Sequence, residues 1–186
     1  MTKYKIPQVK KLSEESRHLY DVINDESDIA CVLIGTSYLD QTLASFLERH
    51  FIESQIVAKL LNPNGGALGT FNGRADIAYC LGLISKSFYA NLCKIAEIRN
   101  KFAHRHLLLT FGDPEIITSI EALTFPTVTE SFAIDEDGQR HDNPDPFSLI
   151  KHPRYKFNFV VIMMVNSLLL SGLTTKRKEG KPEEWS

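Results

Sequence analysis

The sequence is poor in cysteine and in net charge. Its three cysteines, Cys31, Cys80 and Cys93, lie among apolar residues without a CxxC spacing, which predicts buried free thiols and excludes a disulfide scaffold. The formal net charge is only -2, so the chain as a whole has no positive field that would attract nucleic-acid phosphates. We therefore expect a cytoplasmic protein that does not bind DNA through bulk charge.

A signal peptide and an unambiguous membrane span are also missing. The N-terminal segment, MTKYKIPQVKKLSEESRHLY, contains no continuous apolar stretch of the kind that directs secretion. Residues 155–173 are nearly apolar, yet they are at the short end of the ~20 residues that a span needs, and they include Lys156, Asn158 and Asn166. We predict that this segment is a central helix of a soluble bundle and that the protein does not enter a membrane.

Motifs for nucleotide, metal or covalent chemistry are lacking as well. The glycine-rich run at residues 65–70 has no P-loop lysine and follows no convincing strand, so it predicts a structural turn. His104 and His106 have no further ligands at zinc spacing, and Asp135 and Asp137 lack the other ligands of a calcium loop. The sequence also contains no GxSxG motif. It therefore predicts no cofactor and no bound metal.

Helical signals, by contrast, run through most of the chain. With 186 residues, 43% of them hydrophobic, it has enough apolar material for one ordinary domain without disulfides or metals. Apolar residues recur at three- and four-residue steps, and Ser13, Thr70 and Ser85 are capping residues before such segments. Asp113 followed by Pro114 is a further helix start. These signals predict about six helices, at residues 13–22, 28–51, 70–81, 85–104, 114–123 and 155–170.

One region interrupts this helical pattern. The prolines at positions 126, 144, 146 and 153 exclude long regular structure between residues 124 and 153, although residues 128–134 can begin a small hairpin. We therefore predict an all-α fold in which residues 1–175 form a single-domain helical bundle. Residues 124–153 are an irregular insertion within it, and residues 176–186 form a flexible polar tail.

The residues that point to chemistry lie at the end of the predicted helix 85–104. On an α-helix Asn100 and His104 lie about 40° apart and Arg99 and His104 about 140° apart, so one chain has difficulty in aiming both at one phosphate. A two-fold dimer would overcome this by pairing histidines and arginines for metal-free cleavage of RNA. The alternative is that these residues have a structural role. Arg99 then pairs with a carboxylate such as Asp76 or Glu97, and Asn100 and His104 form hydrogen bonds with backbone groups.

The hydrophobic surface of the predicted bundle indicates self-association. Ile98 and Phe102 lie on the helix that carries Arg99, and the last helix is apolar over most of its length. Together they offer more hydrophobic surface than one small bundle covers. We therefore expect a homodimer.

Three segments resemble the mannitol operon repressor family. They read SDIACVLIGTSYLDQTLASFLERHF, GALGTFNGRADIAYCLGLIS and IRNKFAH followed by LTFGDP, and they occur in this order in the region of residues 28–111. The resemblance implies an all-helical regulator, historically named a transcriptional repressor, whose members lack an evident helix-turn-helix and act through protein partners. It does not extend to residues 124–153 or to the apolar last helix.

The string RNKFAH is also similar to the Arg-x4-His signature of HEPN domains, helical proteins that include dimeric toxins and other ribonucleases. Arg99 and His104 match this signature, and Asn100 matches its frequent second residue. The similarity implies that these three residues are catalytic and that RNA is the substrate.

Two functions from different classes therefore remain open. The first is a non-enzymatic regulatory protein that acts through an unidentified protein partner, without sequence-specific DNA binding. The alternative is a HEPN-type metal-independent endoribonuclease that uses Arg99 and His104. Direct DNA binding through Lys101, Arg105 and the basic residues 176–178 is a third, weaker option.

Overall fold

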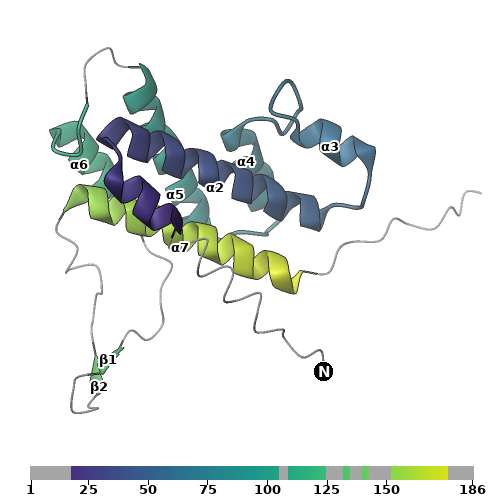
Figure 1. The fold of residues 1–186 in the computed structure, drawn as a ribbon. Coiled ribbons are helices and arrows are strands. Elements are labelled where there is room, and N and C mark those ends of the chain that lie inside the picture. Colours follow the sequence, from purple (N-terminus) through teal and green to yellow (C-terminus); the bar gives the residue numbers. More distant parts are fainter. Residues whose placement is uncertain (1–17, 105–108, 125–131, 135–139, 143–151, 176–186) are drawn as a thin grey trace, which may run out of the picture.

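The computed structural model describes residues 18–104, 109–124, 132–134, 140–142 and 152–175, and Figure 1 shows how they are arranged. Within them, residues 18–25 are helical and precede α2 (Asp28–His50), α3 (Gln55–Leu61), α4 (Phe71–Cys80), α5 (Lys86–His104), α6 (Pro114–Glu121) and α7 (Pro153–Thr174). Two short strands, β1 (Phe132–Ile134) and β2 (Arg140–Asp142), lie between α6 and α7 in the sequence. The fold is a helical bundle with a small hairpin, as the sequence predicts.

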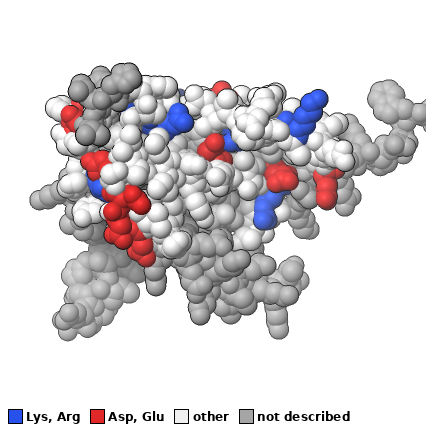
Figure 2. All heavy atoms as spheres, turned by 45° about the horizontal axis from the view of Figure 1, so that its top comes forward, with Lys and Arg blue, Asp and Glu red and all other residues white. Residues whose placement is uncertain are grey.

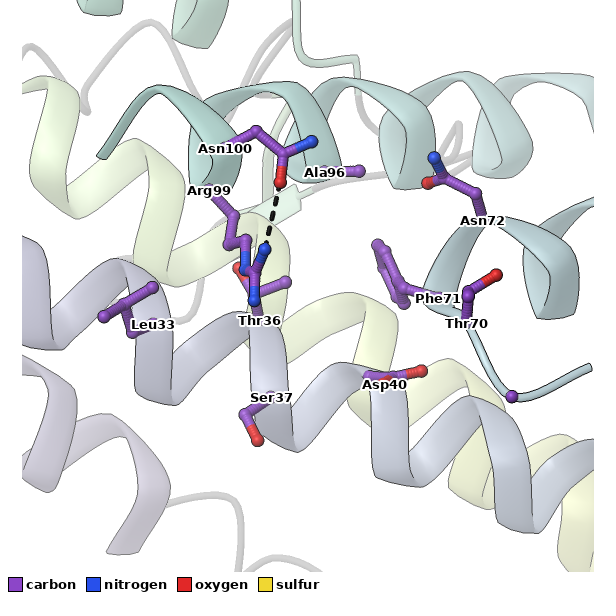
Figure 3. A pocket seen from close by; sticks show the side chains of 11 residues that line it. Leu33, Thr36, Ser37, Asp40, Thr70, Phe71, Asn72, Ala96, Arg99 and Asn100 are labelled. Atoms are coloured by element: carbon purple, nitrogen blue, oxygen red, sulfur yellow. Dashed lines mark hydrogen bonds between the residues drawn. The ribbon is translucent and has the colours of Figure 1, made fainter. Parts of the chain in front are cut away.

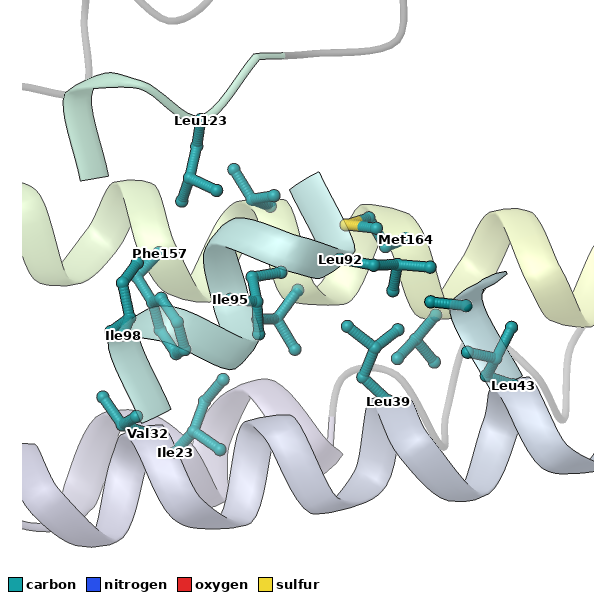
Figure 4. Packing of buried hydrophobic residues seen from close by; sticks show 14 of the residues in the cluster. Ile23, Val32, Leu39, Leu43, Leu92, Ile95, Ile98, Leu123, Phe157 and Met164 are labelled. Carbon is teal, nitrogen blue, oxygen red and sulfur yellow. The ribbon is translucent and has the colours of Figure 1, made fainter. Parts of the chain in front are cut away.

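Helix α2 lies at the centre of the bundle. It packs against α7, α5 and α4, and the side chains that these helices turn inward form one apolar core. Hydrogen bonds join Arg154 to Asp28 near the two helix starts and Arg49 to Gly172 near the two ends, so α2 and α7 run parallel (Figure 1). Figure 4 shows part of the core, with Val32, Leu39, Leu43, Leu92, Ile95, Ile98, Phe157 and Met164 labelled on α2, α5 and α7.

Side-chain caps account for several helix starts. The hydroxyl of Thr70 accepts a hydrogen bond from the Gly73 N–H at 3.1 Å, and Thr70 is thereby the N-cap of α4 as predicted. Asp113 precedes α6 but makes no capping bond to it, because its carboxylate accepts hydrogen bonds from the backbone and side chain of Thr110 instead. Helix α6 begins with Pro114, whose fixed φ suits the first turn.

Some helix boundaries differ from those predicted. The described part of the first helix runs from residue 18 to residue 25, beyond the predicted end at residue 22, and its predicted start at Ser13 lies outside the described residues. Helix α3 was not predicted; it is only seven residues long, and Val57 is its one buried residue. Helix α7 begins at Pro153, which the sequence analysis assigned to the insertion, because proline is well accommodated in a first helical turn.

The hairpin lies in the predicted insertion. Strand β1 pairs antiparallel with β2, and Phe132 is opposite Asp142 while Ile134 is opposite Arg140. In Figure 1 the pair lies apart from the bundle formed by α2, α5 and α7. The segment that joins the two strands and the predicted tail at residues 176–186 lie outside the described residues.

The apolar helix α7 is a core helix of this bundle. By length and composition α7 and α2 are each long and apolar enough to cross a membrane. Core helices of soluble proteins share that property, and here α7 buries Phe157 and Asn158 completely. The Asn158 amide donates a hydrogen bond to Oδ1 of Asn24 at 2.7 Å and accepts one from the Cys31 thiol at 3.0 Å. These contacts favour the interpretation of α7 as a core helix over that of a membrane span.

The three cysteines differ in their surroundings. Cys31 is buried, whereas Cys80 and Cys93 are exposed, so the prediction of three buried thiols is wrong for two of them. The reason is their place on the helices: Cys80 is the last residue of α4, and Cys93 lies on the face of α5 opposite the core. All three are free.

This difference predicts the pattern of thiol alkylation. Burial raises the pKa of the Cys31 thiol to about 11, so its thiolate is scarce as well as shielded. Iodoacetamide at about pH 8 should therefore modify Cys80 and Cys93 in the native protein and modify Cys31 only after unfolding. Mass spectrometry of the alkylated peptides checks this. A Cys31 adduct formed as fast as the other two would contradict the packing of α2 against α7.

Candidate functional site

The candidate residues Arg99, Asn100 and His104 lie in the last two turns of α5. Helix α5 starts where the hydroxyl of Ser85 accepts a hydrogen bond from the Phe88 N–H at 3.2 Å, and its apolar residues share one face. The buried residues of that face are Phe88, Asn91, Leu92, Ile95, Ala96, Ile98 and Phe102. The three candidate residues are exposed as a consequence.

Ile98 and Phe102 belong to the protein's own core. They are 0% and 2% exposed, and the ring of Phe111 packs on Phe102 with their centroids 5.7 Å apart. The expectation that these two residues offer surface to a second copy is therefore wrong. The exposed large apolar residues of α7 are Tyr155, Leu170 and Leu173.

A pocket opens beside Arg99, between α2, the start of α4 and the end of α5 (Figure 3). Its volume is about 710 Å³. We call it the Arg99 pocket, and it is lined by Leu33, Thr36, Ser37, Asp40, Gly69, Thr70, Phe71, Asn72, Ala96, Arg99 and Asn100. Only two of these side chains carry a charge, and the other polar ones are hydroxyls and amides.

Arg99 has no ion-pair partner among the residues that the structure describes. Its guanidinium donates a hydrogen bond to Oδ1 of Asn100 at 3.0 Å, and no carboxylate in the described part of the chain forms an ion pair with it. The other charged group, Asp40, is paired with the almost fully buried Arg74 at 2.5 Å. Arg74 also donates to the carbonyl oxygen of Leu61 at 2.8 Å, which fixes its position. The positive charge of Arg99 is thus available to a ligand.

The hydroxyl of Thr36 is a buried polar group without a partner. Thr36 lines the Arg99 pocket from α2, is 5% exposed, and its Oγ1 forms no hydrogen bond in the described structure (Figure 3). Thr42, two turns further along α2, satisfies its hydroxyl by donating to the carbonyl oxygen of Tyr38 at 2.8 Å. A buried polar group without a hydrogen-bond partner lowers the stability of the fold by about 1–3 kcal/mol. Sequence analysis missed Thr36, and its only signal is the polar pair Thr36-Ser37 in an apolar stretch of α2.

The first turn of α4 forms another wall of the Arg99 pocket. The backbone N–H of Gly73 is capped by Thr70, and the N–H of Arg74 donates to the carbonyl oxygen of Thr70 at 3.0 Å. The N–H groups of Phe71 and Asn72 precede these and have no acceptor within the helix. The start of α4 therefore presents the positive end of a helix dipole to the pocket.

A second pocket of about 620 Å³ opens on the other side of Asn100. We call it the His104 pocket, and it is lined by Asn72, Asp76, Tyr89, Cys93, Ala96, Glu97, Asn100, Lys101 and His104. The Tyr89 hydroxyl donates to Asp76 at 2.8 Å, which raises the pKa of Tyr89, and its ring stacks on that of Tyr79. Asp76, one of the carboxylates expected to pair with Arg99, therefore binds Tyr89 instead.

Glu97 is the other such carboxylate, and it binds lysines. Its two oxygens lie 2.6 Å from Nζ of Lys94 and 2.9 Å from Nζ of Lys101. These hydrogen bonds lower the pKa of Glu97 to about 2. Lys101 also donates a hydrogen bond to the hydroxyl of Ser119 at 2.8 Å, which links the Lys101 ammonium group to α6. The charges of Glu97 and Lys101 in the His104 pocket are thus already compensated.

Arg99 and His104 do not share a pocket. Arg99 lines the first pocket, His104 lines the second, and Asn100 lines both. This separation agrees with their angular spacing on the helix and means that one protomer does not aim the two groups at a common point. Within the described residues there is also no group of three or more His, Cys, Asp or Glu side chains that could hold a metal.

The surface charge is mixed. Figure 2 shows one face of the molecule on which basic and acidic residues are interspersed and most of the surface is uncharged. The described residues on that face form no continuous basic patch of the kind that follows a nucleic-acid backbone.

Three comparisons with known proteins place these observations in context. A family model described as mannitol repressor matches residues 15–175, which includes the insertion and the last helix to which the sequence resemblance did not extend. A similar solved structure is described as the X-ray structure of the MtlR-HPr complex from Escherichia coli. The match has a TM-score of 0.53 and 17% identity, and it covers 84% of this chain and 97% of that one. Comparison with curated protein sequences gives no match. Because the family model spans most of its length, this chain belongs to the mannitol repressor family.

Proposed function

We propose that this chain is a non-enzymatic regulatory protein that acts in the cytoplasm by binding a protein partner of the HPr type. The observation that carries the proposal is the similarity in fold to a chain of the Escherichia coli MtlR-HPr complex, of which the match covers 97%. Membership of the mannitol repressor family supports the regulatory role.

The charges of the chain support action through a protein rather than through DNA. The net charge of -2 gives the chain as a whole no positive field that attracts DNA, and the described residues on the face seen in Figure 2 form no basic patch. Arg99 and His104 line different pockets of one protomer, so the ribonuclease alternative requires a second copy to bring the two groups together.

A binding measurement tests this proposal. Isothermal titration calorimetry of the purified full chain with the HPr-type protein of the same organism should show saturable binding. A duplex from the neighbouring operator region should bind no more tightly than a scrambled duplex. Absence of binding to the HPr-type protein would contradict the proposal. So would chelator-resistant cleavage of RNA that is lost in His104→Ala while the melting temperature stays unchanged.

Self-association is a further part of this proposal. Since Ile98 and Phe102 are buried in the monomer, the part of the last helix that this proposal offers to a second copy is the end of α7, where Leu170 and Leu173 are exposed. They are 50% and 36% exposed. Light scattering at micromolar concentration distinguishes a homodimer from a monomer.

A further inference from the structure

We propose that the Arg99 pocket binds a small phosphorylated molecule that is rich in hydroxyl groups. This site is separate from the protein partner proposed above and does not depend on it. Three independent features of the pocket carry the inference: its unpaired positive charge, its unsatisfied buried hydroxyl, and its size and lining.

The positive charge comes from two elements that converge on the pocket. Arg99 extends from α5 toward α2 (Figure 3). Among the described residues, its guanidinium forms a hydrogen bond only with the neutral side chain of Asn100. The first turn of α4, with the N–H groups of Phe71 and Asn72, adds the positive end of a helix dipole. Phosphate groups bind at helix starts and accept paired hydrogen bonds from arginine, so the two elements together favour a phosphoryl group.

The hydroxyl of Thr36 indicates that a ligand completes this site. It is buried in the pocket wall and has no partner in the described structure, although a threonine on a helix can donate to the carbonyl one turn earlier, as Thr42 does. Because Oγ1 is itself covered in this structure, a ligand oxygen would reach it and accept the missing hydrogen bond after a shift of the side chains that cover it. The unsatisfied group thus becomes satisfied on binding, which adds to affinity.

The size and lining of the pocket indicate the rest of the molecule. Its volume of about 710 Å³ lies within the range of about 300–1,000 Å³ that is usual for small-molecule sites. Ser37, Thr70 and Asn72 offer uncharged donors and acceptors, which match ligand hydroxyl groups. Asp40 can accept from such a hydroxyl, and since Arg74 compensates its charge, it repels a phosphate less than a free carboxylate would. A sugar phosphate or polyol phosphate has this combination of groups.

Calorimetry with defined probes tests the inference. Glucose 6-phosphate should bind the full chain, whereas glucose, inorganic phosphate and succinate should each bind at least about tenfold more weakly, because each lacks either the phosphoryl group or the hydroxyl-rich body. Arg99→Gln should weaken binding of glucose 6-phosphate at least about tenfold, and Thr36→Val, which keeps the side-chain shape, should weaken it severalfold.

The matched control is Lys86→Gln. This substitution removes the same charge from an exposed residue of α5 that lies outside the pocket, and it should leave the affinity unchanged. Circular dichroism of each variant confirms that the fold is retained, and Arg99→Lys should restore part of the affinity. The inference is overturned if glucose binds as tightly as its phosphate, if inorganic phosphate or succinate binds as tightly, or if Arg99→Gln and Lys86→Gln have equal effects. Binding of the HPr-type protein to Arg99→Gln is measured separately, so failure here and failure of the proposed function remain distinguishable.

Discussion

Arg154→Ala should lower the free energy of unfolding by about 3 kcal/mol, because it removes one partner of a largely buried ion pair. Arg154 lies in the first turn of α7, where its Nη1 is 2.7 Å from a carboxylate oxygen of Asp28 and its side chain is 15% exposed. Its Nη2 donates to the carbonyl oxygens of Ile23 at 2.8 Å and Asn24 at 3.0 Å, and to that of Glu26. The substitution leaves these acceptors and the Asp28 charge without their shared donor.

Arg99→Ala is the matched control for that experiment. Arg99 is exposed and its one described hydrogen bond joins it to its sequence neighbour Asn100, so its loss should change the free energy of unfolding by less than about 0.5 kcal/mol. Urea denaturation followed by circular dichroism measures both variants. Equal effects of Arg154→Ala and Arg99→Ala would contradict the role of Arg154 in joining α7 to the start of α2.

Gly66→Ala should also destabilise the protein by about 3 kcal/mol and should disturb the Arg99 pocket. A Cβ at Gly66 would lie 2.6 Å from the carbonyl oxygen of Lys59 and 2.7 Å from that of Asn62, distances that real Cβ atoms do not adopt. The loop would have to open, which breaks the hydrogen bonds from Gly66 N to Asn62 and from Leu68 N to the carbonyl of Leu60. This loop leads into Gly69 and Thr70, and both line the pocket.

Gly112→Ala serves as the control for Gly66→Ala. A Cβ at Gly112 would have only an ordinary contact with Oγ1 of Thr110 at 3.4 Å, and the residue does not have a positive φ. Its substitution should therefore change stability by less than about 0.5 kcal/mol. Thermal denaturation compares the two variants. For a chain of this size, each kcal/mol of destabilisation lowers the melting temperature by about 2–4 °C. Melting temperatures of Gly66→Ala and Gly112→Ala that differ by only a degree or two would therefore contradict the predicted clash.

Local signals in the sequence were sufficient for most of the secondary structure. The three- and four-residue apolar spacing of residues 28–51 predicted α2 almost to its ends, and the capping side chains of Thr70 and Ser85 predicted where α4 and α5 begin. Such signals act within one or two turns, so they are present in the sequence itself. Helix α3 escaped prediction because a seven-residue helix with one buried residue has almost no periodicity.

The candidate site was predicted in part, and the missing part depends on contacts between distant segments. The sequence identified Arg99, Asn100 and His104 and, from the helical angle alone, the difficulty of aiming Arg99 and His104 at one point. Whether Arg99 has a carboxylate partner among the described residues was decided by tertiary packing, which pairs Asp40 with Arg74, 34 residues away, and leaves Arg99 without one there. The burial of Thr36 without a partner was decided in the same way, because it depends on how α4 and α5 approach α2.

The sequence by itself thus determined the helical class, the main helix starts and the amphipathic face of α5, since spacing and capping are local. Only the tertiary structure decided which apolar residues are surface and which are core. Ile98 and Phe102 appear free on their own helix but are buried in the core, where Phe111 packs on Phe102, while Cys80 and Cys93 are left exposed in apolar stretches. The physical reason is that burial, pairing and pocket shape depend on the relative placement of segments far apart in the chain, and spacing along one helix contains no information about it.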